Sequence, residues 1–316
     1  MSRLIADGNS LPKDLLNPLA EPHAAADPRD LAVSEQFSRK FARELSNKQD
    51  PQSADGSPVA LEICVDSLEV LDIARLGKNR FEVCSNLIHG GGLTPSIGLI
   101  RAIRSRYPEA RLMAMIRPRI GPFVYSETEL CVMEQDILAF KSEGVNGVVF
   151  GCLTEEGEVD MKACSRLAKA AHPLDITFHR AIDVSCDLAR SFWNIATIDG
   201  VTRILSSGQA RTAPEGIPGL SILSKLCAMH RLHSGRSISV LPGSGLNADN
   251  VGGMLDKIAS VREVHMTGSS TVVLSTAASP AGQRRKELGF GADEAWTMDR
   301  EKVAAVWAAM KVRYGL

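Results

Sequence analysis

The sequence has few of the features that mark a membrane protein or a nucleic-acid-binding protein. Its 316 residues contain no apolar run near the roughly 18 residues that a membrane-spanning helix needs. Aromatic residues make up only 5% of the chain. The net charge of −1 and the pI of about 6.7 provide no basic footprint for a nucleic acid. We therefore expect a protein that binds neither a membrane nor a nucleic acid.

The cysteines are not spaced as a disulfide framework or as a CxxC motif. Seven cysteines are spread along the chain, and an odd number cannot pair completely. The first 21 residues also lack the basic-then-apolar layout of a secretory signal. We expect reduced thiols and a cytoplasmic location.

Residues 1–58 differ in composition from the rest of the chain. They are rich in Pro, Asp, Ala, Ser and Lys and contain no strand-like run. Such a segment buries too little apolar surface to offset the entropy lost on ordering. We expect residues 1–58 to be a mostly disordered N-terminal extension. A helix over residues 30–46 that docks on the folded domain is the alternative.

From residue 59 onward, short β-rich runs alternate with helical segments. The expected strands are 60–65, 80–84, 112–116, 147–150, 175–178, 202–205, 237–241 and 263–266. The expected helices are 67–76, 96–106, 127–143, 161–171, 187–198, 217–232, 247–258 and a last helix over 299–312. Residues 275–297 interrupt this last unit and are expected to form a surface loop.

Eight strand–helix units predict a (β/α)₈ TIM-type barrel over residues 59–316. Strand–helix alternation favours parallel strands with helical crossovers, and eight such units close into a barrel. An open doubly wound sheet is the alternative. No GxGxxG motif follows the first strand, so we expect no nucleotide cofactor.

Charged residues gather at the strand ends where such barrels place their active sites. The candidate pocket residues are Glu62, Glu82, Arg117, His179, Arg180, Asp183 and His265. Carboxylates inside a barrel need partners, and Arg117 and the two histidines are the natural ones. We interpret the group as a pocket for a small substrate that carries a carboxylate or a phosphate. A structural ion-pair network that caps the barrel is the alternative.

Two glycine-bearing loops follow the seventh and eighth strands. The candidate anion-binding residues are Gly243, Ser244, Gly245, Gly268 and Ser269. Barrels often bind phosphate with backbone N–H groups of these two loops. Plain turns that use glycine are the alternative.

Cys64 and Cys84 offer a different chemistry. They end neighbouring strands, which lie about 4.8 Å apart in a sheet. Two thiolates at that distance can bind Cu(I), a soft ion, and Met113 and Met115 on the next strand could add thioether ligands. Inert cysteines that fill the core are the alternative.

Several motifs together make the chain resemble the CutC family of copper-homeostasis proteins. The matching segments are residues 62–67, 80–85, 91–96, 115–119, 148–151, 177–181, 203–208, 242–245 and 263–265. The resemblance implies a (β/α)₈ barrel, a cytosolic homodimer and a role in copper homeostasis, with Cu(I) binding reported for the family. It implies no known enzyme reaction. The chain departs from the family pattern at three places. Ser244 replaces the middle glycine of PGGG, Ile182 replaces the phenylalanine of HRAFD, and Gly77-Lys78-Asn79 stands where the family often has a glycine pair.

Two functions therefore remain open after the sequence is read. The first is a cytosolic copper-homeostasis protein that binds Cu(I). The second is a barrel enzyme of unknown reaction that acts on a small carboxylate or phosphate. A non-catalytic interaction protein has no specific support in the sequence.

Overall fold

The computed structural model describes residues 60–68, 79–258, 260–273, 279–289 and 294–314. The extension expected over residues 1–58 lies outside the described residues. Most of the helix expected over residues 67–76 lies outside them too.

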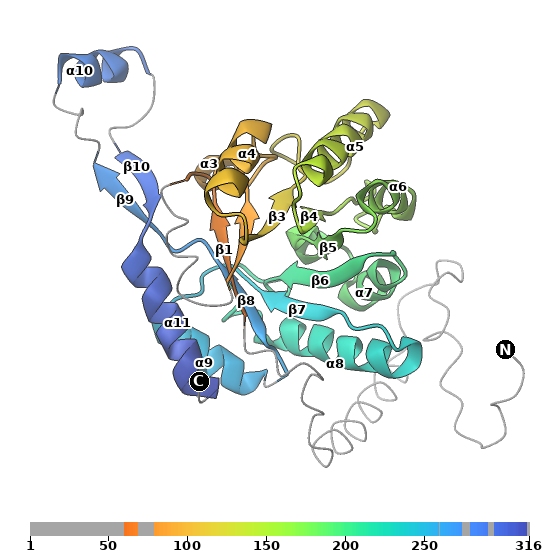
Figure 1. Cartoon of the computed structure of the whole chain (residues 1–316). Helices are drawn as coiled ribbons and strands as arrows, with labels where there is room; N and C mark the ends of the chain where they lie inside the picture. The colour runs from red at the N-terminus through yellow and green to blue at the C-terminus, as the bar shows by residue number, and fades with distance from the viewer. Residues whose placement is uncertain (1–59, 69–78, 259, 274–278, 290–293, 315–316) are drawn as a thin grey trace, which may run out of the picture. The chain divides into compact units, whose positions relative to one another are not determined.

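Eight parallel strands form the centre of the molecule and pair in the order β7-β6-β5-β4-β3-β2-β1-β8 (Figure 1). They are β1 (Ala60–Val65), β2 (Arg80–Val83), β3 (Arg111–Met115), β4 (Gly147–Phe150), β5 (Asp175–Phe178), β6 (Val201–Ser206), β7 (Ser239–Pro242) and β8 (Glu263–Met266). A parallel bridge between Gly243 and His265 joins the end of β7 to β8 and completes the circuit. The predicted (β/α)₈ barrel is confirmed.

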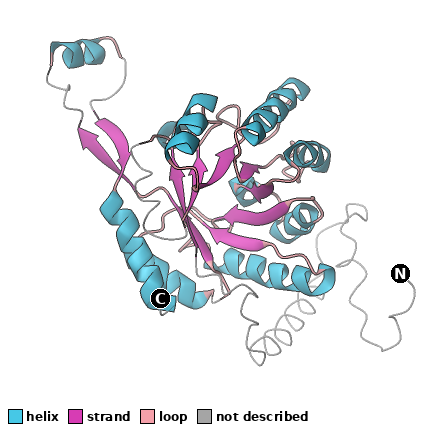
Figure 2. Cartoon of the chain, in the orientation of Figure 1, coloured by secondary structure: helices cyan, strands magenta, loops and turns pink. Residues whose placement is uncertain are grey.

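Helices lie outside the strands, as Figure 2 shows. They are α3 (Leu87–Gly90), α4 (Ile97–Arg106), α5 (Glu127–Ser142), α6 (Met161–Ala171), α7 (Leu188–Ala196), α8 (Ile217–Ser234), α9 (Ala248–Lys257) and α11 (Arg300–Tyr314), with a 3₁₀ turn at Arg180–Val184. Capping residues in the sequence mark where several of these helices begin. A capping box of Ser126 and Glu129 begins α5, and one of Asn247 and Asn250 begins α9. None of the described helices has both the length and the apolar composition needed to span a bilayer.

Alternation along each strand separates an apolar layer from a polar interior. In β1, Leu61, Ile63 and Val65 belong to the large apolar cluster between the strands and the helices. Glu62 and Cys64 point the other way, into the barrel, and are equally buried. The interior of such a barrel is ordinarily packed with branched apolar side chains. Here much of it is built from charged groups.

The chain after β8 corrects the expectation of a surface loop over residues 275–297. Glu294–Met298 form β10, which pairs antiparallel with β9 (Ser269–Val273), and Pro280–Glu287 form α10. The side chain of Ser279 caps α10 by accepting a hydrogen bond from the Gly282 amide. Three consecutive β-branched residues, Thr271 to Val273, favour the strand that the sequence reading missed.

Candidate functional site: a buried dithiol above an ion-pair network

Two cysteines from neighbouring strands meet inside the C-terminal half of the barrel. Register places Cys64 of β1 opposite Glu82 of β2, and Cys84 follows two residues later on the same face. The two Sγ atoms are 3.4 Å apart, and both side chains are at most 4% exposed. The two cysteines, which the sequence analysis places at the ends of neighbouring strands, thus lie side by side.

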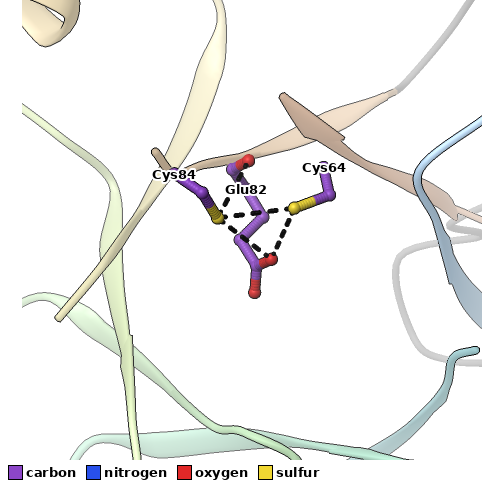
Figure 3. Close-up of side chains that lie close together, drawn as sticks. All are labelled: Cys64, Glu82 and Cys84. Atoms are coloured by element: carbon purple, nitrogen blue, oxygen red, sulfur yellow. Dashed lines mark hydrogen bonds between the residues drawn. The ribbon is translucent and has the colours of Figure 1, made fainter. Parts of the chain in front are cut away.

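One oxygen of the Glu82 carboxylate contacts both thiols (Figure 3). Cys64 Sγ donates to Glu82 Oε2 at 2.9 Å, and Cys84 Sγ is 3.5 Å from the same oxygen. The second oxygen, Glu82 Oε1, is buried and has no hydrogen-bond partner within the described part of the chain. The carboxylate therefore has capacity to spare on the side away from the thiols.

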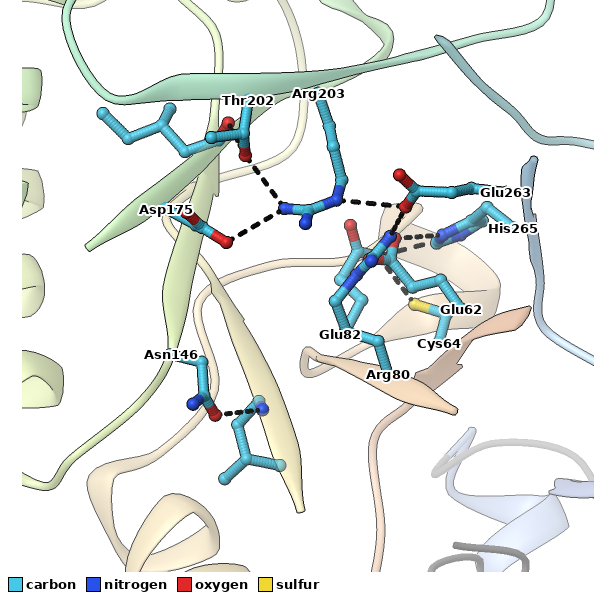
Figure 4. Close-up of polar contacts among 12 residues, drawn as sticks. Glu62, Cys64, Arg80, Glu82, Asn146, Asp175, Thr202, Arg203, Glu263 and His265 are labelled. Carbon is cyan, nitrogen blue, oxygen red and sulfur yellow. Dashed lines mark hydrogen bonds and ion pairs between the residues drawn. The ribbon is translucent and has the colours of Figure 1, made fainter. Parts of the chain in front are cut away.

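Below the thiols, a continuous chain of charged side chains crosses the barrel (Figure 4). Arg203 contacts Asp175 at 3.4 Å and Glu263 at 3.0 Å. Arg80 Nη2 contacts the same oxygen of Glu263 at 2.6 Å, and Arg80 Nε donates to Glu62. Each arginine thus bridges two carboxylates that arrive from different strands.

His265 connects this network to the dithiol. Its Nδ1 is 2.8 Å from Glu62 Oε1, and its Nε2 is 3.8 Å from Glu82 Oε2. His265 is therefore a partner of the buried carboxylates, as the sequence predicted. The expectation that Arg117 pairs with these carboxylates was wrong. Arg80 forms the ion pair with Glu62 instead. The reason is register, which pairs Glu62 directly with Arg80 on β2.

The protonation states follow from burial and from these partners. Burial would raise the pKa of Glu62, but Arg80 and then His265 outweigh it and lower that pKa to about 2. Among the described residues, no arginine forms an ion pair with Glu82, and burial raises its pKa. Burial opposes charge on His265, but Glu82 and Glu62 together raise its pKa. The network thus holds Glu62 ionised and leaves Glu82 the weaker acid.

Burial raises the pKa of both thiols. The pKa of Cys84 rises to about 12, and that of Cys64 lies well above its ordinary value, with its neighbours Cys84 and Glu82 adding to the effect of burial. Without a metal ion, both groups are therefore neutral thiols near pH 7. A cation that binds both sulfurs must displace their protons.

Methionines and a glycine turn cover the dithiol. Met113 and Met115 of β3, with Val149 and Leu87, form one small apolar cluster with the two cysteines. A Cβ added to Gly92 would lie 3.3 Å from Cys84 Sγ and 3.6 Å from Met115 Cε. The turn can approach the thiol this closely because residue 92 has no side chain and takes a positive φ of 88°.

Arg117 holds that turn in place. Its Nη1 donates to the carbonyl oxygens of Gly90 at 2.6 Å and Gly92 at 3.2 Å. Its guanidinium also lies 5.0 Å from the centroid of the Phe123 ring. Among the described residues, Arg117 forms no ion pair with Glu62 or Glu82. It therefore supports the backbone over Cys84 rather than the carboxylates below.

His179 lies beside the Arg117 group. Its ring is 4.7 Å from Phe123, and its Nδ1 accepts a hydrogen bond from the Ala181 amide. Burial, with a contribution from Arg117, lowers the pKa of His179 to about 3, so the ring is neutral and its proton is on Nε2. That Nε2 has no partner within the described part of the chain.

Arg180 and Asp183 form a separate group at the ends of β5 and β6. Arg180 Nε is 2.8 Å from Asp183 Oδ2. The Asp183 carboxylate also accepts hydrogen bonds from the Ser206 hydroxyl, the Ser207 amide and hydroxyl, and the Gln209 amide. These donors surround a carboxylate of the protein itself, so this group fastens the two loops together.

The residues of the loop after β7 contact other parts of the chain. The Gly243 amide donates to the Ser206 carbonyl at 3.0 Å, and a Cβ at Gly243 would come within 3.3 Å of the His265 ring. Ser244 has a positive φ of 82°, and its hydroxyl donates to the Arg211 carbonyl. Gly245 packs on Thr212. Gly243 thus lets β7 approach β8 closely at the point of barrel closure.

The loop after β8 supports the hairpin and the last helix. Gly268 packs against Val303 of α11, and its carbonyl accepts a hydrogen bond from the Asp299 amide at 2.8 Å. Ser269 begins β9. Anion binding by these five loop residues stays a prediction.

Two sets of donors in this site could hold a metal ion. The first set is Cys64, Glu82 and Cys84, and the second is Glu62, Glu82 and His265. In each set the donor atoms lie within 4.8 Å of one another. The two sulfurs of the first set suit a soft ion. In the second set, Glu62 is already engaged in an ion pair with Arg80. The dithiol is therefore the better metal site.

The sequence reading missed Arg80, Arg203 and Glu263. Alternation could have found two of them, because Arg80 and Glu263 precede Glu82 and His265 by two residues and so share their faces. Active sites of such barrels lie at the C-terminal ends of the strands, whereas these three residues lie nearer the N-terminal ends.

These features define a (β/α)₈ barrel with a charged interior that ends in a buried dithiol. The chain belongs to the CutC family, whose model matches residues 59–270. A CutC family protein of Sinorhizobium medicae is 40% identical over 254 residues, which cover 80% of this chain and 96% of that protein. A copper homeostasis protein cutC homolog of Caenorhabditis elegans is 39% identical over 199 residues, which cover 63% of this chain and 76% of that protein.

A solved structure agrees with the fold. The crystal structure of a copper homeostasis protein CutC from Streptococcus agalactiae superposes with a TM-score of 0.59 at 31% sequence identity. The match covers 66% of this chain and 98% of that one. The family resemblance drawn from the strand-end motifs is confirmed.

Replacing Arg80 by Met tests whether the interior network stabilises the barrel. Removing one partner of a buried ion pair strands the other, so we expect Arg80→Met to lower the free energy of unfolding by about 3–5 kcal/mol. Arg101→Met breaks an exposed pair with Glu143 and is the matched control, which should leave stability unchanged. Chemical denaturation measures both variants. A loss in Arg80→Met no larger than that in the control would contradict the structural role.

Proposed function

We propose that this protein binds Cu(I) through the thiolates of Cys64 and Cys84 as part of copper homeostasis. The observation that carries the proposal is the dithiol itself, with its two sulfurs 3.4 Å apart in a buried site. Thiolates are the ligands that Cu(I) prefers. Two relatives whose names refer to copper homeostasis support the same assignment.

The surroundings of the dithiol suit a monovalent soft cation. Met113 and Met115 belong to the same small apolar cluster as the two cysteines, and their thioethers are the same kind of soft donor. The apolar cover excludes water, which protects Cu(I) from competing oxygen ligands. Binding replaces two S–H bonds by two S–Cu bonds and releases two protons, so the bound unit carries a charge of −1.

The cellular setting belongs to the same proposal. Reduced cysteines and Cu(I) both require a reducing compartment, which supports a cytosolic location. A homodimer is the assembly that the family resemblance implies. Neither property enters the chemistry of the dithiol.

An enzyme acting on a small carboxylate or phosphate is a second candidate, and one observation favours it. Three polar atoms in or near the barrel interior have no hydrogen-bond partner in the described part of the chain: Glu82 Oε1, Thr177 Oγ1 and His179 Nε2. Buried polar atoms of this kind call for an explanation, and a bound polar ligand or water is one. Native mass spectrometry of the purified protein separates the two candidates, because it reports a retained organic mass or a copper ion directly.

Replacing both cysteines by serine tests the copper proposal. Serine is close to cysteine in size but is a poor ligand for a soft ion, so we expect Cys64→Ser with Cys84→Ser to abolish Cu(I) binding in an anaerobic chelator competition. Cys131→Ser with Cys186→Ser removes two exposed cysteines and is the matched control. Circular dichroism checks that each variant is folded. An unchanged Cu(I) affinity in the first double variant would remove the dithiol from consideration.

The Cu(I) affinity should also rise steeply with pH. Because burial raises the pKa of both thiols, both are protonated at neutrality, and both protons must leave when Cu(I) binds. Two released protons increase the apparent association constant by about 100-fold per pH unit. Chelator competitions from about pH 6 to about pH 8, corrected for the chelator's own protonation, measure the slope. An affinity that does not change over this range would mean that the ligands are not these thiols.

A further inference from the structure

A small cavity lies beside Cys64 and is bounded on one side by the β9–β10 hairpin. Its volume is about 20 Å³, and its lining includes Cys64, Asp66, Ser269, Trp296 and Met298. A volume of that size holds about one water molecule. It can admit a metal ion but not an organic ligand, for which pockets are typically about 300–1,000 Å³.

Three of the lining groups attract a soft cation. Met298 has a thioether sulfur, Trp296 offers an aromatic face, and Asp66 brings a negative charge. Burial and the Glu82 charge raise the pKa of Cys84, and the charge of Asp66 adds a smaller increase. Thioether, aromatic ring and carboxylate thus lie around the same small space as Cys64.

Within the described residues, two other directions to the sulfurs are blocked. The turn at Gly92 lies directly over Cys84 and is fastened there by Arg117. Glu82 and His265 fill the barrel below the thiols. Cys64 is only 4% exposed, and the cavity is the space that adjoins it at the C-terminal end of the barrel.

We propose that this cavity is the entrance through which Cu(I) reaches the dithiol, and that Met298 is the first ligand to take the ion. This inference rests on the proposed function and deepens it. Met298 lies beyond residues 59–270, the segment that the CutC family model matches.

The base of the hairpin is built to hold Met298 in position. Met298 pairs with Ser269 across the two strands. The next residue, Asp299, accepts a hydrogen bond from the Ser270 hydroxyl at 2.8 Å and donates its amide to Gly268. Lys302 Nζ donates to the Ser269 carbonyl at 3.1 Å. These contacts fix both strands at the end nearest the cavity.

Replacing Met298 by Leu removes the sulfur and conserves the side-chain volume. Met310→Leu, in the buried core of α11, is the matched control. The experiment follows anaerobic transfer of Cu(I) from its bicinchoninate complex to the protein and, in reverse, from the loaded protein to the chelator. A ligand that serves only in transit lowers the barrier in both directions equally. We expect Met298→Leu to slow both rates by about tenfold or more, which leaves the equilibrium affinity within about threefold.

The outcomes separate the entrance from the dithiol. Rates in Met298→Leu equal to those of Met310→Leu and of the parent would overturn the entrance, and so would a change in the reverse rate alone. A parent protein that takes up no Cu(I) would overturn the proposed function instead. The entrance is then decided by NMR of ¹³C-methyl methionine in the Cys64→Ser, Cys84→Ser variant titrated with Ag(I). The Met298 methyl resonance should shift before that of Met310, and the absence of such a shift would refute the proposal.

Discussion

The bridge that Arg80 makes between Glu62 and Glu263 is the interaction on which the rest of the interior depends. It brings together carboxylates from β1 and β8 on a side chain from β2, in a space where uncompensated charge would be very costly. Arg203 extends the same arrangement toward β5. The strands that close the barrel therefore meet through ion pairs rather than through interlocking apolar side chains. A buried network of this kind specifies partners more than it adds stability, since hydrophobic replacements can be equally stable.

The same network sets the chemistry of the sulfur site above it. Arg80 satisfies Glu62 and leaves Glu82 without a guanidinium partner, so Glu82 is the weaker acid and is available to the thiols. The two cysteines and Met115 then form a soft layer on a charged one. This ordering, with hard donors deep in the barrel and soft donors toward the C-terminal end, favours a soft ion in the upper layer. Arg117 donates to backbone carbonyls rather than to the carboxylates, and these hydrogen bonds hold the turn over Cys84 in place.

Most of the fold could be predicted from the sequence, because alternation and strand–helix periodicity are local properties. The strands at 60–65, 147–150, 175–178 and 263–266 agree with the structure at both ends. The pairing of Cys64 with Cys84 also followed from adjacent strands with the same alternation. What could not be predicted depends on register around a closed barrel. Only register shows that Arg80, not Arg117, meets Glu62, and that Arg117 donates instead to the carbonyls of the turn over Cys84. The β9–β10 hairpin was missed for another reason, because its two strands pair across an insertion rather than within one unit.

The central claim is that a single Cu(I) ion is held by the two buried thiolates, and X-ray absorption at the copper edge tests it most directly. The protein is loaded anaerobically with one equivalent of Cu(I). The account predicts a Cu(I) edge and a first coordination shell that contains the two sulfurs of Cys64 and Cys84. A first shell made of nitrogen and oxygen without sulfur would place the ion on Glu62, Glu82 and His265 instead, and would contradict the account.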